Sequence, residues 1–175
     1  GTVPERFREE IAEWGIWSYR VMMFERDHHG NFCTSDRYAA NALVTFNTHD
    51  LATFAGWRSA GDLNLKRSLG LDPGESDDAR HHALRMLADV LRHNAIERDD
   101  FFAVLAFLAR TRSRLLAISL EDLLGVADQP NIPGTVNEHP NWRRRLDVEV
   151  SRLAEAFDVA ALKNAVSERR GGHMA

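Results

Sequence analysis

Three short, unbroken apolar runs limit the folds open to this chain. They occupy residues 21–24, 42–46 and 115–120. Runs without polar alternation are typical of strands in a parallel sheet that is covered on both faces. The sequence between the second and third runs has helical periodicity, and strands that alternate with helices predict βαβ units. We therefore expect a helix-rich α/β fold with a parallel sheet.

Capping residues and apolar periodicity predict two helices between the second and third runs. Ser76 can cap a helix, because the apolar residues after it fall on one face. These residues are Ala83, Leu84, Leu87, Ala88 and Leu91. Asp99 or Asp100 can begin the next helix, and residues 101–108 are apolar nearly all round. That second helix should therefore be well buried.

The last part of the chain predicts a loop followed by helices. Residues 125–141 are rich in Pro, Gly and Asn and show no periodicity. A long aperiodic stretch of this kind is usually a functional loop or a linker. A helix is expected from Trp142 to Phe157, with its apolar residues on one face, and a final helix over residues 159–168.

These patterns suggest how the chain is divided. Residues 1–125 are expected to form the main unit, with a helical insertion at about residues 76–110. Residues 126–170 are expected to add a loop and the C-terminal helices of the same domain. Residues 171–175, Gly-Gly-His-Met-Ala, are interpreted as a cloning remnant and carry no functional argument.

Composition excludes several classes of function. The 22 basic and 26 acidic residues give a net charge of −4, which argues against a general nucleic-acid binder. The basic run at residues 143–145 is interpreted as a solvated helix face. The single cysteine, Cys33, cannot form an intramolecular disulfide and fits a cytoplasmic location. No apolar run approaches the roughly 20 residues of a membrane helix, so no membrane contact is expected.

The most informative polar cluster is Thr48-His49-Asp50, directly after the second apolar run. Ligands and catalysis in parallel α/β sheets lie at the carboxyl ends of the strands. A His-Asp pair at that end can place a carboxylate and a hydrogen-bond donor against a sugar hydroxyl. The alternative is structural, since Asp50 can also cap the segment that follows it.

The paired histidines do not form a convincing metal site. His28-His29 and His81-His82 are each adjacent in sequence. Adjacent residues do not face one point on a helix, and no Cys or carboxylate stands at zinc-finger spacing from them. We therefore expect no metal.

Four tryptophans offer aromatic faces on which a sugar ring can stack. They are Trp14, Trp17, Trp57 and Trp142. Aromatic side chains at such positions lie more often in a hydrophobic core. The sequence leaves both interpretations open for each of them.

Several motifs together resemble the 4-α-glucanotransferase family, also called amylomaltases or disproportionating enzymes. The most distinctive is Asn131-Ile132-Pro133-Gly134-Thr135, followed by Glu138 and by Pro140-Asn141-Trp142-Arg143-Arg144-Arg145-Leu146. The others lie at residues 1–4, 24–27, 48–51, 56–57 and 120–125. Their shared order and spacing make the resemblance specific, and it extends to about Phe157.

This resemblance implies a (β/α)8 TIM barrel, of which this chain would be the C-terminal part with strands six to eight. It also implies transfer of α-1,4-glucan segments between maltooligosaccharides by a retaining double displacement, without cofactor or metal. Asp50 matches the aspartate that stabilises the transition state, and His49 matches its sugar-contacting neighbour. Asn131 and Trp57, which lie in matching motifs, are the further expected substrate contacts.

The resemblance also implies that the chain is incomplete as a catalyst. In the family, the nucleophilic Asp and the acid/base Glu precede the segment that this chain matches. We therefore expect the isolated chain to be inactive and to self-associate through the exposed edge of its first strand. The sequence departs from the family where residues 32–35 lack the usual proline, and where Ala52 replaces a common one.

Two alternatives to this interpretation stay open. A metal-dependent phosphohydrolase would use His49 and Asp50 with other histidines, and a bound divalent metal would identify it. A glucan-binding or structural fragment without catalysis would bind glucan and show no turnover.

Overall fold

A three-stranded parallel sheet forms the centre of the molecule. The structure is a computed structural model that describes Pro4 and residues 6–167. The strands are β1 (Ser18–Val21), β2 (Ala42–Thr45) and β3 (Leu115–Leu116), in that order across the sheet. Leu43 of β2 lies opposite both Tyr19 of β1 and Leu115 of β3. The expected α/β fold with a parallel sheet is therefore confirmed.

Two of the three strands have limits other than those predicted. The first apolar run forms the 3-10 helix η1 (Met22–Phe24), because the chain turns there and buries Met22 completely. The third run becomes helical at its end, where Ser119 caps α6 (Leu120–Leu123). A continuous apolar run thus marks burial without fixing the backbone conformation.

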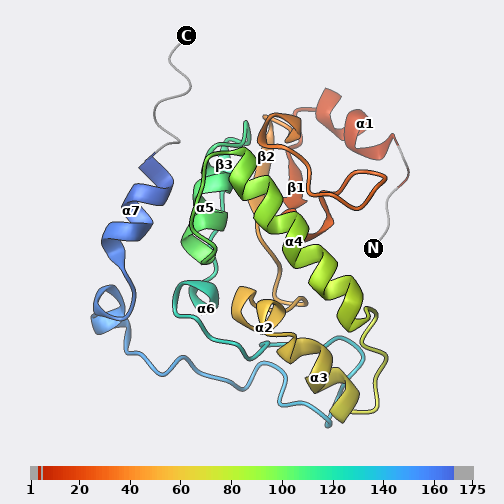
Figure 1. Cartoon of the computed structure of the whole chain (residues 1–175), viewed down its shortest axis with the longest axis vertical. Coiled ribbons are helices and arrows are strands. Elements are labelled where there is room, and N and C mark those ends of the chain that lie inside the picture. Colours follow the sequence, from red (N-terminus) through yellow and green to blue (C-terminus); the bar gives the residue numbers. More distant parts are fainter. Residues whose placement is uncertain (1–3, 5, 168–175) are drawn as a thin grey trace.

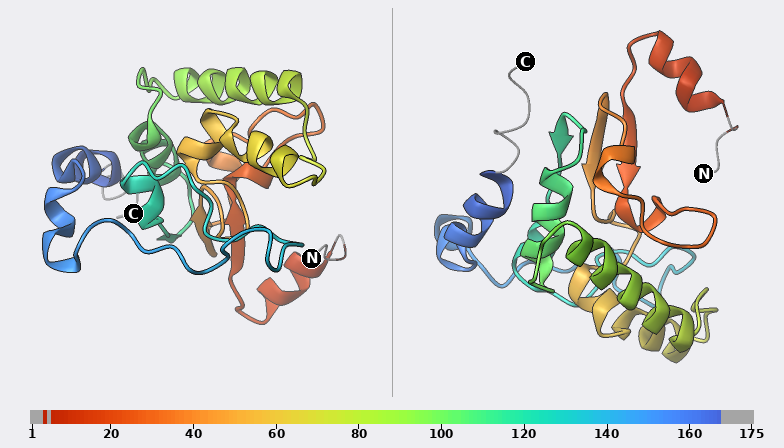
Figure 2. Two further views of the ribbon diagram at one scale, coloured as in Figure 1. Left: turned by 90° about the horizontal axis from the view of Figure 1, so that it is seen from below. Right: turned by 45° about the horizontal axis from the view of Figure 1, so that its top comes forward.

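The helices predicted from capping residues are present. α4 (Asp77–His93) begins at Ser76, whose Oγ accepts a hydrogen bond from the backbone N–H of Ala79 at 3.1 Å. α5 (Phe101–Ala109) begins at Asp100 with a bond of the same kind at 3.0 Å. The remaining helices are α1 (Phe7–Glu13), η2 (Ser35–Arg37), α2 (Phe54–Arg58), α3 (Gly61–Ser68), η3 (Val150–Glu155) and α7 (Val159–Ser167). α4 crosses one face of the sheet (Figures 1 and 2). Among the described residues, no helix is both long and apolar enough to cross a membrane.

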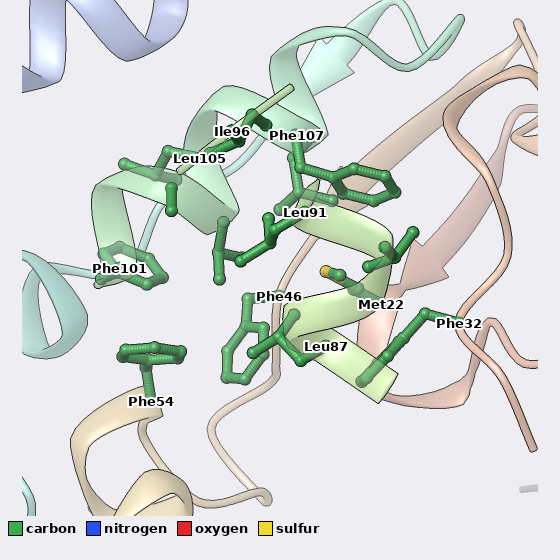
Figure 3. Close-up of a cluster of buried hydrophobic side chains, with 14 of the residues drawn as sticks. Met22, Phe32, Phe46, Phe54, Leu87, Leu91, Ile96, Phe101, Leu105 and Phe107 are labelled. Atoms are coloured by element: carbon green, nitrogen blue, oxygen red, sulfur yellow. The ribbon is translucent and has the colours of Figure 1, made fainter. Parts of the chain in front are cut away.

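The core lies between the sheet and helices α2, α4 and α5. Phe46, which directly follows β2, packs edge to face against Phe54 and Phe101, with ring centroids 5.5 and 6.3 Å apart (Figure 3). It packs in the same way against Trp57, at a centroid distance of 6.0 Å. Burial of each large apolar side chain contributes about 1.5–3 kcal/mol to the free energy of folding. This packing fixes the end of β2, and with it the start of the loop that follows.

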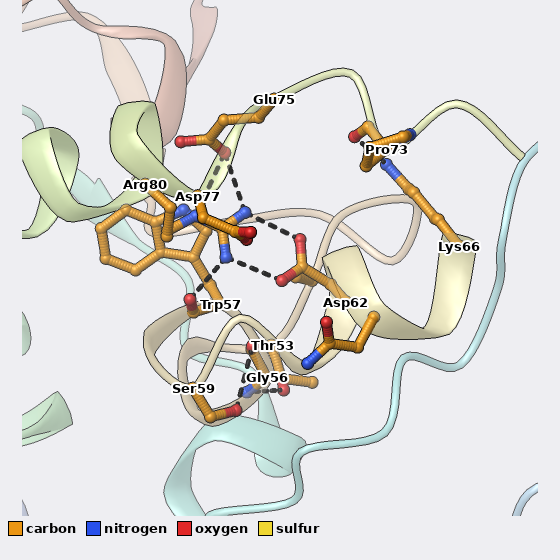
Figure 4. A network of polar contacts seen from close by, with 12 residues as sticks. Thr53, Gly56, Trp57, Ser59, Asp62, Lys66, Pro73, Glu75, Asp77 and Arg80 are labelled. Atoms are coloured by element: carbon orange, nitrogen blue, oxygen red, sulfur yellow. Dashed lines mark hydrogen bonds and ion pairs between the residues drawn. The ribbon is translucent and has the colours of Figure 1, made fainter. Parts of the chain in front are cut away.

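A buried arginine joins α2, α3 and α4. The Arg80 side chain is 3% exposed and donates to Asp62 at 2.7 and 2.9 Å, and to Glu75 at 2.8 Å (Figure 4). It also donates to the backbone oxygen of Trp57 at 2.6 Å and lies over the indole ring. Nothing in the sequence indicates this network, because the partners of Arg80 lie 5 to 23 residues away from it.

The predicted helix from Trp142 to Phe157 is wrong in its first half. Residues 142–149 are a loop, and a short 3-10 helix, η3, follows them. The Trp142 backbone has a positive φ of 61° and donates its N–H to the Pro130 oxygen, which ties it to the preceding loop. The segment then runs through η3 to α7 (Figure 1). Residues 1–3 of the first family motif and the presumed cloning remnant lie outside the described residues.

Candidate active site

The loop after β2 turns tightly and presents His49 and Asp50 to solvent. Thr48 makes the turn: its carbonyl oxygen accepts from the Leu51 N–H at 3.0 Å, and its Oγ1 accepts from the Asp50 N–H at 3.3 Å. The buried Asn47 donates from Nδ2 to the Ala52 oxygen at 2.9 Å. The His49 and Asp50 side chains are 62% and 48% exposed. Both are therefore free to meet a ligand at the carboxyl end of the sheet.

Helix α2 is capped by Thr53, and Asp50 has no part in that cap. Thr53 Oγ1 accepts from the Gly56 N–H and donates to the Ala127 oxygen, both at 3.1 Å. The structural alternative for Asp50 is therefore wrong. At Gly56, a Cβ atom would collide with the Ala127 oxygen, so only glycine allows the two segments this close approach.

A buried carboxylate, Asp122, holds the far end of the loop. Its Oδ1 accepts from the Phe54 N–H at 2.6 Å, and its Oδ2 accepts from the Ser119 hydroxyl at 2.9 Å. The nearby Asn47 side chain also lowers the pKa of this carboxylate. Burial raises the pKa of Asp122 despite these bonds. Through Asp122, the segment after β3 fixes the place where the 47–53 loop joins α2.

Asn131 and Gln129 bring the distant 126–141 loop to Asp50. Asn131 Nδ2 donates to Asp50 Oδ1 at 2.5 Å, across 81 positions in the sequence. The buried Gln129 donates from Nε2 to the backbone oxygens of Asp50, at 3.0 Å, and of Asn131, at 2.6 Å. One loop therefore restrains both the backbone and the carboxylate of Asp50. No sequence signal marks Gln129 as a site residue, although it lies two residues before the motif asparagine.

The structure brings together three of the four predicted site residues. His49, Asp50 and Asn131 lie in one cluster, with His49 Nε2 3.5 Å from Asp50 Oδ2. The prediction that Trp57 contacts substrate is corrected: Trp57 is 2% exposed and packs in the core against Phe46. The aromatic ring beside His49 belongs to Trp142, at a centroid distance of 5.2 Å.

A hollow of about 360 Å³ opens beside this cluster. Its walls come from β1, from the end of β2 and the 47–53 loop, from the segment between β3 and α6 with the start of α6, and from residues 130–144. The residues with the clearest chemistry in these walls are Tyr19, Thr48, His49, Glu121, Trp142 and Arg144. The volume falls within the range of small-ligand sites, and the mixture of aromatic faces with hydrogen-bonding groups is typical of them. No sequence signal marks Tyr19, Glu121 or Arg144 as site residues, because nothing local relates them to His49.

The described residues form no cluster of three or more His, Cys, Asp or Glu side chains that could hold a metal ion. His81 and His82 lie on α4 and belong to no such cluster. The metal-dependent phosphohydrolase alternative therefore finds no support in the geometry.

Comparison with known proteins decides the family. The family model described as 4-alpha-glucanotransferase matches residues 1–150. The chain belongs to the 4-α-glucanotransferase family. The prediction made from the order and spacing of the motifs is thereby confirmed.

Two curated relatives carry the same family name. A 4-alpha-glucanotransferase of Haemophilus influenzae is 31% identical over 93% of this chain and 25% of its own length. One from Mycobacterium tuberculosis is 34% identical over 82% of this chain and 22% of its own length. The chain thus spans about a quarter of the curated relatives that it matches.

Solved structures support the fold. Amylomaltase from Corynebacterium glutamicum aligns with a TM-score of 0.76 at 24% identity, over 97% of this chain and 27% of its own. Amylomaltase from Streptococcus agalactiae in complex with acarbose aligns with a TM-score of 0.52 at 20% identity, over 99% and 31% of the two chains. The helix-rich chain with its small parallel sheet fits part of a TIM barrel.

Proposed function

We propose that this chain forms one wall of the active site of a 4-α-glucanotransferase, with Asp50 as its catalytic carboxylate. The complete enzyme would move α-1,4-glucan segments between maltooligosaccharides by a retaining double displacement. The observation that carries the proposal is the restrained Asp50 carboxylate beside His49, at the carboxyl end of a parallel strand. The solved relative that holds acarbose supports a ligand of this kind.

Asp50 would act by hydrogen bonding and by charge. A retaining glycosyl transfer passes through a transition state in which positive charge develops on the sugar, and bonds to sugar hydroxyls tighten there. A carboxylate fixed in advance stabilises such charge without reorganising during the reaction. Asn131 holds Oδ1, so Oδ2 is left toward His49 and an incoming hydroxyl. His49 would donate a further hydrogen bond to the same sugar.

The nucleophile and the acid/base would come from a part of the protein that precedes this chain. In that arrangement β1, β2 and β3 would be the sixth, seventh and eighth strands of a (β/α)8 barrel, and the protein would be cytoplasmic. The isolated chain would then bind glucan at best and would not turn it over. General acid catalysis alone contributes about 10²–10⁴-fold to such reactions.

The free edge of β1 would promote association of the isolated chain. Within the described residues, β1 pairs with β2 on one side and has no strand on the other. Large apolar side chains are exposed on β1 and next to it, with Trp17 at 41%, Tyr19 at 52% and Phe24 at 65%. Unpaired edges of this kind invite pairing with another chain. Light scattering that finds a monomer at high protein concentration would count against this proposal.

The test compares the isolated chain with the full-length protein that contains it. Each is incubated with maltotriose, and the products are separated by chromatography, with Asp50→Asn assayed alongside. The full-length protein should release glucose and longer oligomers, and Asp50→Asn should abolish this release. The isolated chain should release neither product. Turnover by the isolated chain at the rate of the full-length protein would overturn the division of roles.

A further inference from the structure

Trp142 combines an exposed ring with a constrained backbone. Its side chain is 63% exposed, and it lines the hollow next to His49. Its φ of 61° lies in the left-handed region, which bulky residues avoid. An aromatic residue held in such a conformation and left open to water calls for an explanation, because neither feature favours the folded chain.

The neighbouring loop holds Trp142 in this conformation. Its backbone N–H donates to the Pro130 oxygen at 3.0 Å. The preceding Asn141 accepts from the Ile132 N–H at 2.9 Å, and its Nδ2 donates to the Thr135 hydroxyl at 2.7 Å. Ile132 is itself buried, which anchors this set of bonds to the interior. The indole is thus fixed in place by the loop, although its ring meets little of the protein.

The indole stands against the His49 imidazole. The two ring centroids are 5.2 Å apart and the planes are tilted by 54°. His49 also lies 3.5 Å from the Asp50 carboxylate. An apolar ring face therefore adjoins two groups that bind hydroxyls, which matches the chemistry of a pyranose, with its apolar C–H face and its polar rim.

We propose that Trp142 is an aromatic platform on which a glucosyl ring of the substrate stacks while His49 and Asp50 bind hydroxyls. This inference rests on the proposed function and adds one residue to it. Trp142 would act through ground-state binding: it covers the apolar face of the sugar equally before and during the reaction. Removing it should therefore raise KM and leave kcat nearly unchanged.

The experiment uses the full-length protein that contains this chain, with maltotriose as the probe and glucose release as the readout. Trp142→Ala removes the ring and keeps a side chain at the left-handed position, whereas glycine there would also relax the backbone. Trp142→Phe retains an aromatic face. Trp14→Ala is the matched control, because Trp14 is a tryptophan of the same chain that does not line the hollow.

We expect Trp142→Ala to raise KM by about three- to tenfold, the range of an aromatic stacking contact. Its kcat should stay within about twofold of wild type, Trp142→Phe should recover most of the loss, and Trp14→Ala should match wild type. An unchanged KM in Trp142→Ala would overturn the platform, and so would equal losses in both Trp142 variants together with a lower melting temperature. A wild-type protein without transfer activity would instead overturn the proposed function, and the platform with it.

Discussion

The buried Arg80 offers the sharpest test of what holds the base of the site in place. Its side chain is 3% exposed, and that of its partner Asp62 is 9% exposed. Burial alone would lower the pKa of Arg80, but the bonds to Asp62 and Glu75 outweigh burial and raise it. The guanidinium is therefore charged in the fold and depends on its carboxylates. Arg80→Met removes that charge while keeping much of the apolar stem.

The expected loss of stability follows from what the substitution leaves behind. Asp62 would keep a nearly buried carboxylate without a counter-charge, and the Trp57 oxygen would lose the donor it has at 2.6 Å. Removing one partner of a buried ion pair costs about 3–5 kcal/mol. Because Glu75 is 27% exposed and can turn to water, we expect the lower end, about 3 kcal/mol. In a chain of this size, that lowers the melting temperature by about 6–12 °C.

A surface pair supplies the control. Arg92 and Asp89 form an ion pair at 2.5 Å, with side chains 71% and 53% exposed. Exposed pairs contribute about 0–1 kcal/mol, so Arg92→Met should lower the melting temperature by no more than about 4 °C. Both variants are measured by thermal unfolding at one protein concentration. If Arg80→Met is no less stable than Arg92→Met, the argument that buried charge joins α2, α3 and α4 is refuted.

Three further predictions concern the loops of the site. Asp122→Asn should be less stable than wild type mainly at low pH. The raised pKa of Asp122 favours the folded wild type below the ordinary value of 3.8, and this gain disappears as pH rises through the folded pKa. Urea unfolding from pH 3 to 7 measures the difference in stability between the two proteins, and a difference that widens with pH would contradict the prediction. Asn131→Ala frees the Asp50 carboxylate and should lower kcat/KM of the full-length protein by about tenfold, which initial rates on maltotriose would show; an unchanged value refutes it. Gly56→Ala meets a backbone oxygen and should cost about 2–3 kcal/mol. Gly61→Ala meets only a movable hydroxyl and gains up to about 1 kcal/mol of helix propensity, so it should be nearly neutral; equal melting temperatures for the two variants would contradict this.

The features that the sequence predicted well are those decided by neighbouring residues. Ser76 and Asp100 cap their helices as expected, since a side-chain oxygen reaches the N–H groups within its own first turn. The apolar helix α5 is buried on nearly all sides, as its composition requires. In each case the residues on which the prediction rests lie within or next to a single helix.

The features that it missed depend on contacts across long stretches of chain. The helix expected from Trp142 is absent, because Pro130 and the Asn141 side chain bind that segment into the loop before it. Trp57 is a core residue instead of a substrate contact, since Arg80 and Phe46 cover its ring. Apolar periodicity records neither kind of contact, because it describes one face of one element.

The same distinction between local and distant contacts applies to the candidate active site. His49 and Asp50 could be found from their place after a buried strand, but the groups that orient Asp50 lie 79 and 81 positions away. Gln129 and Asn131 belong to one short stretch, and they hold the backbone and the carboxylate of Asp50 at the same time. Any shift of that stretch must therefore move the carboxylate. It follows that residues of the 126–141 loop that touch no sugar can still govern transfer through the position of Asp50.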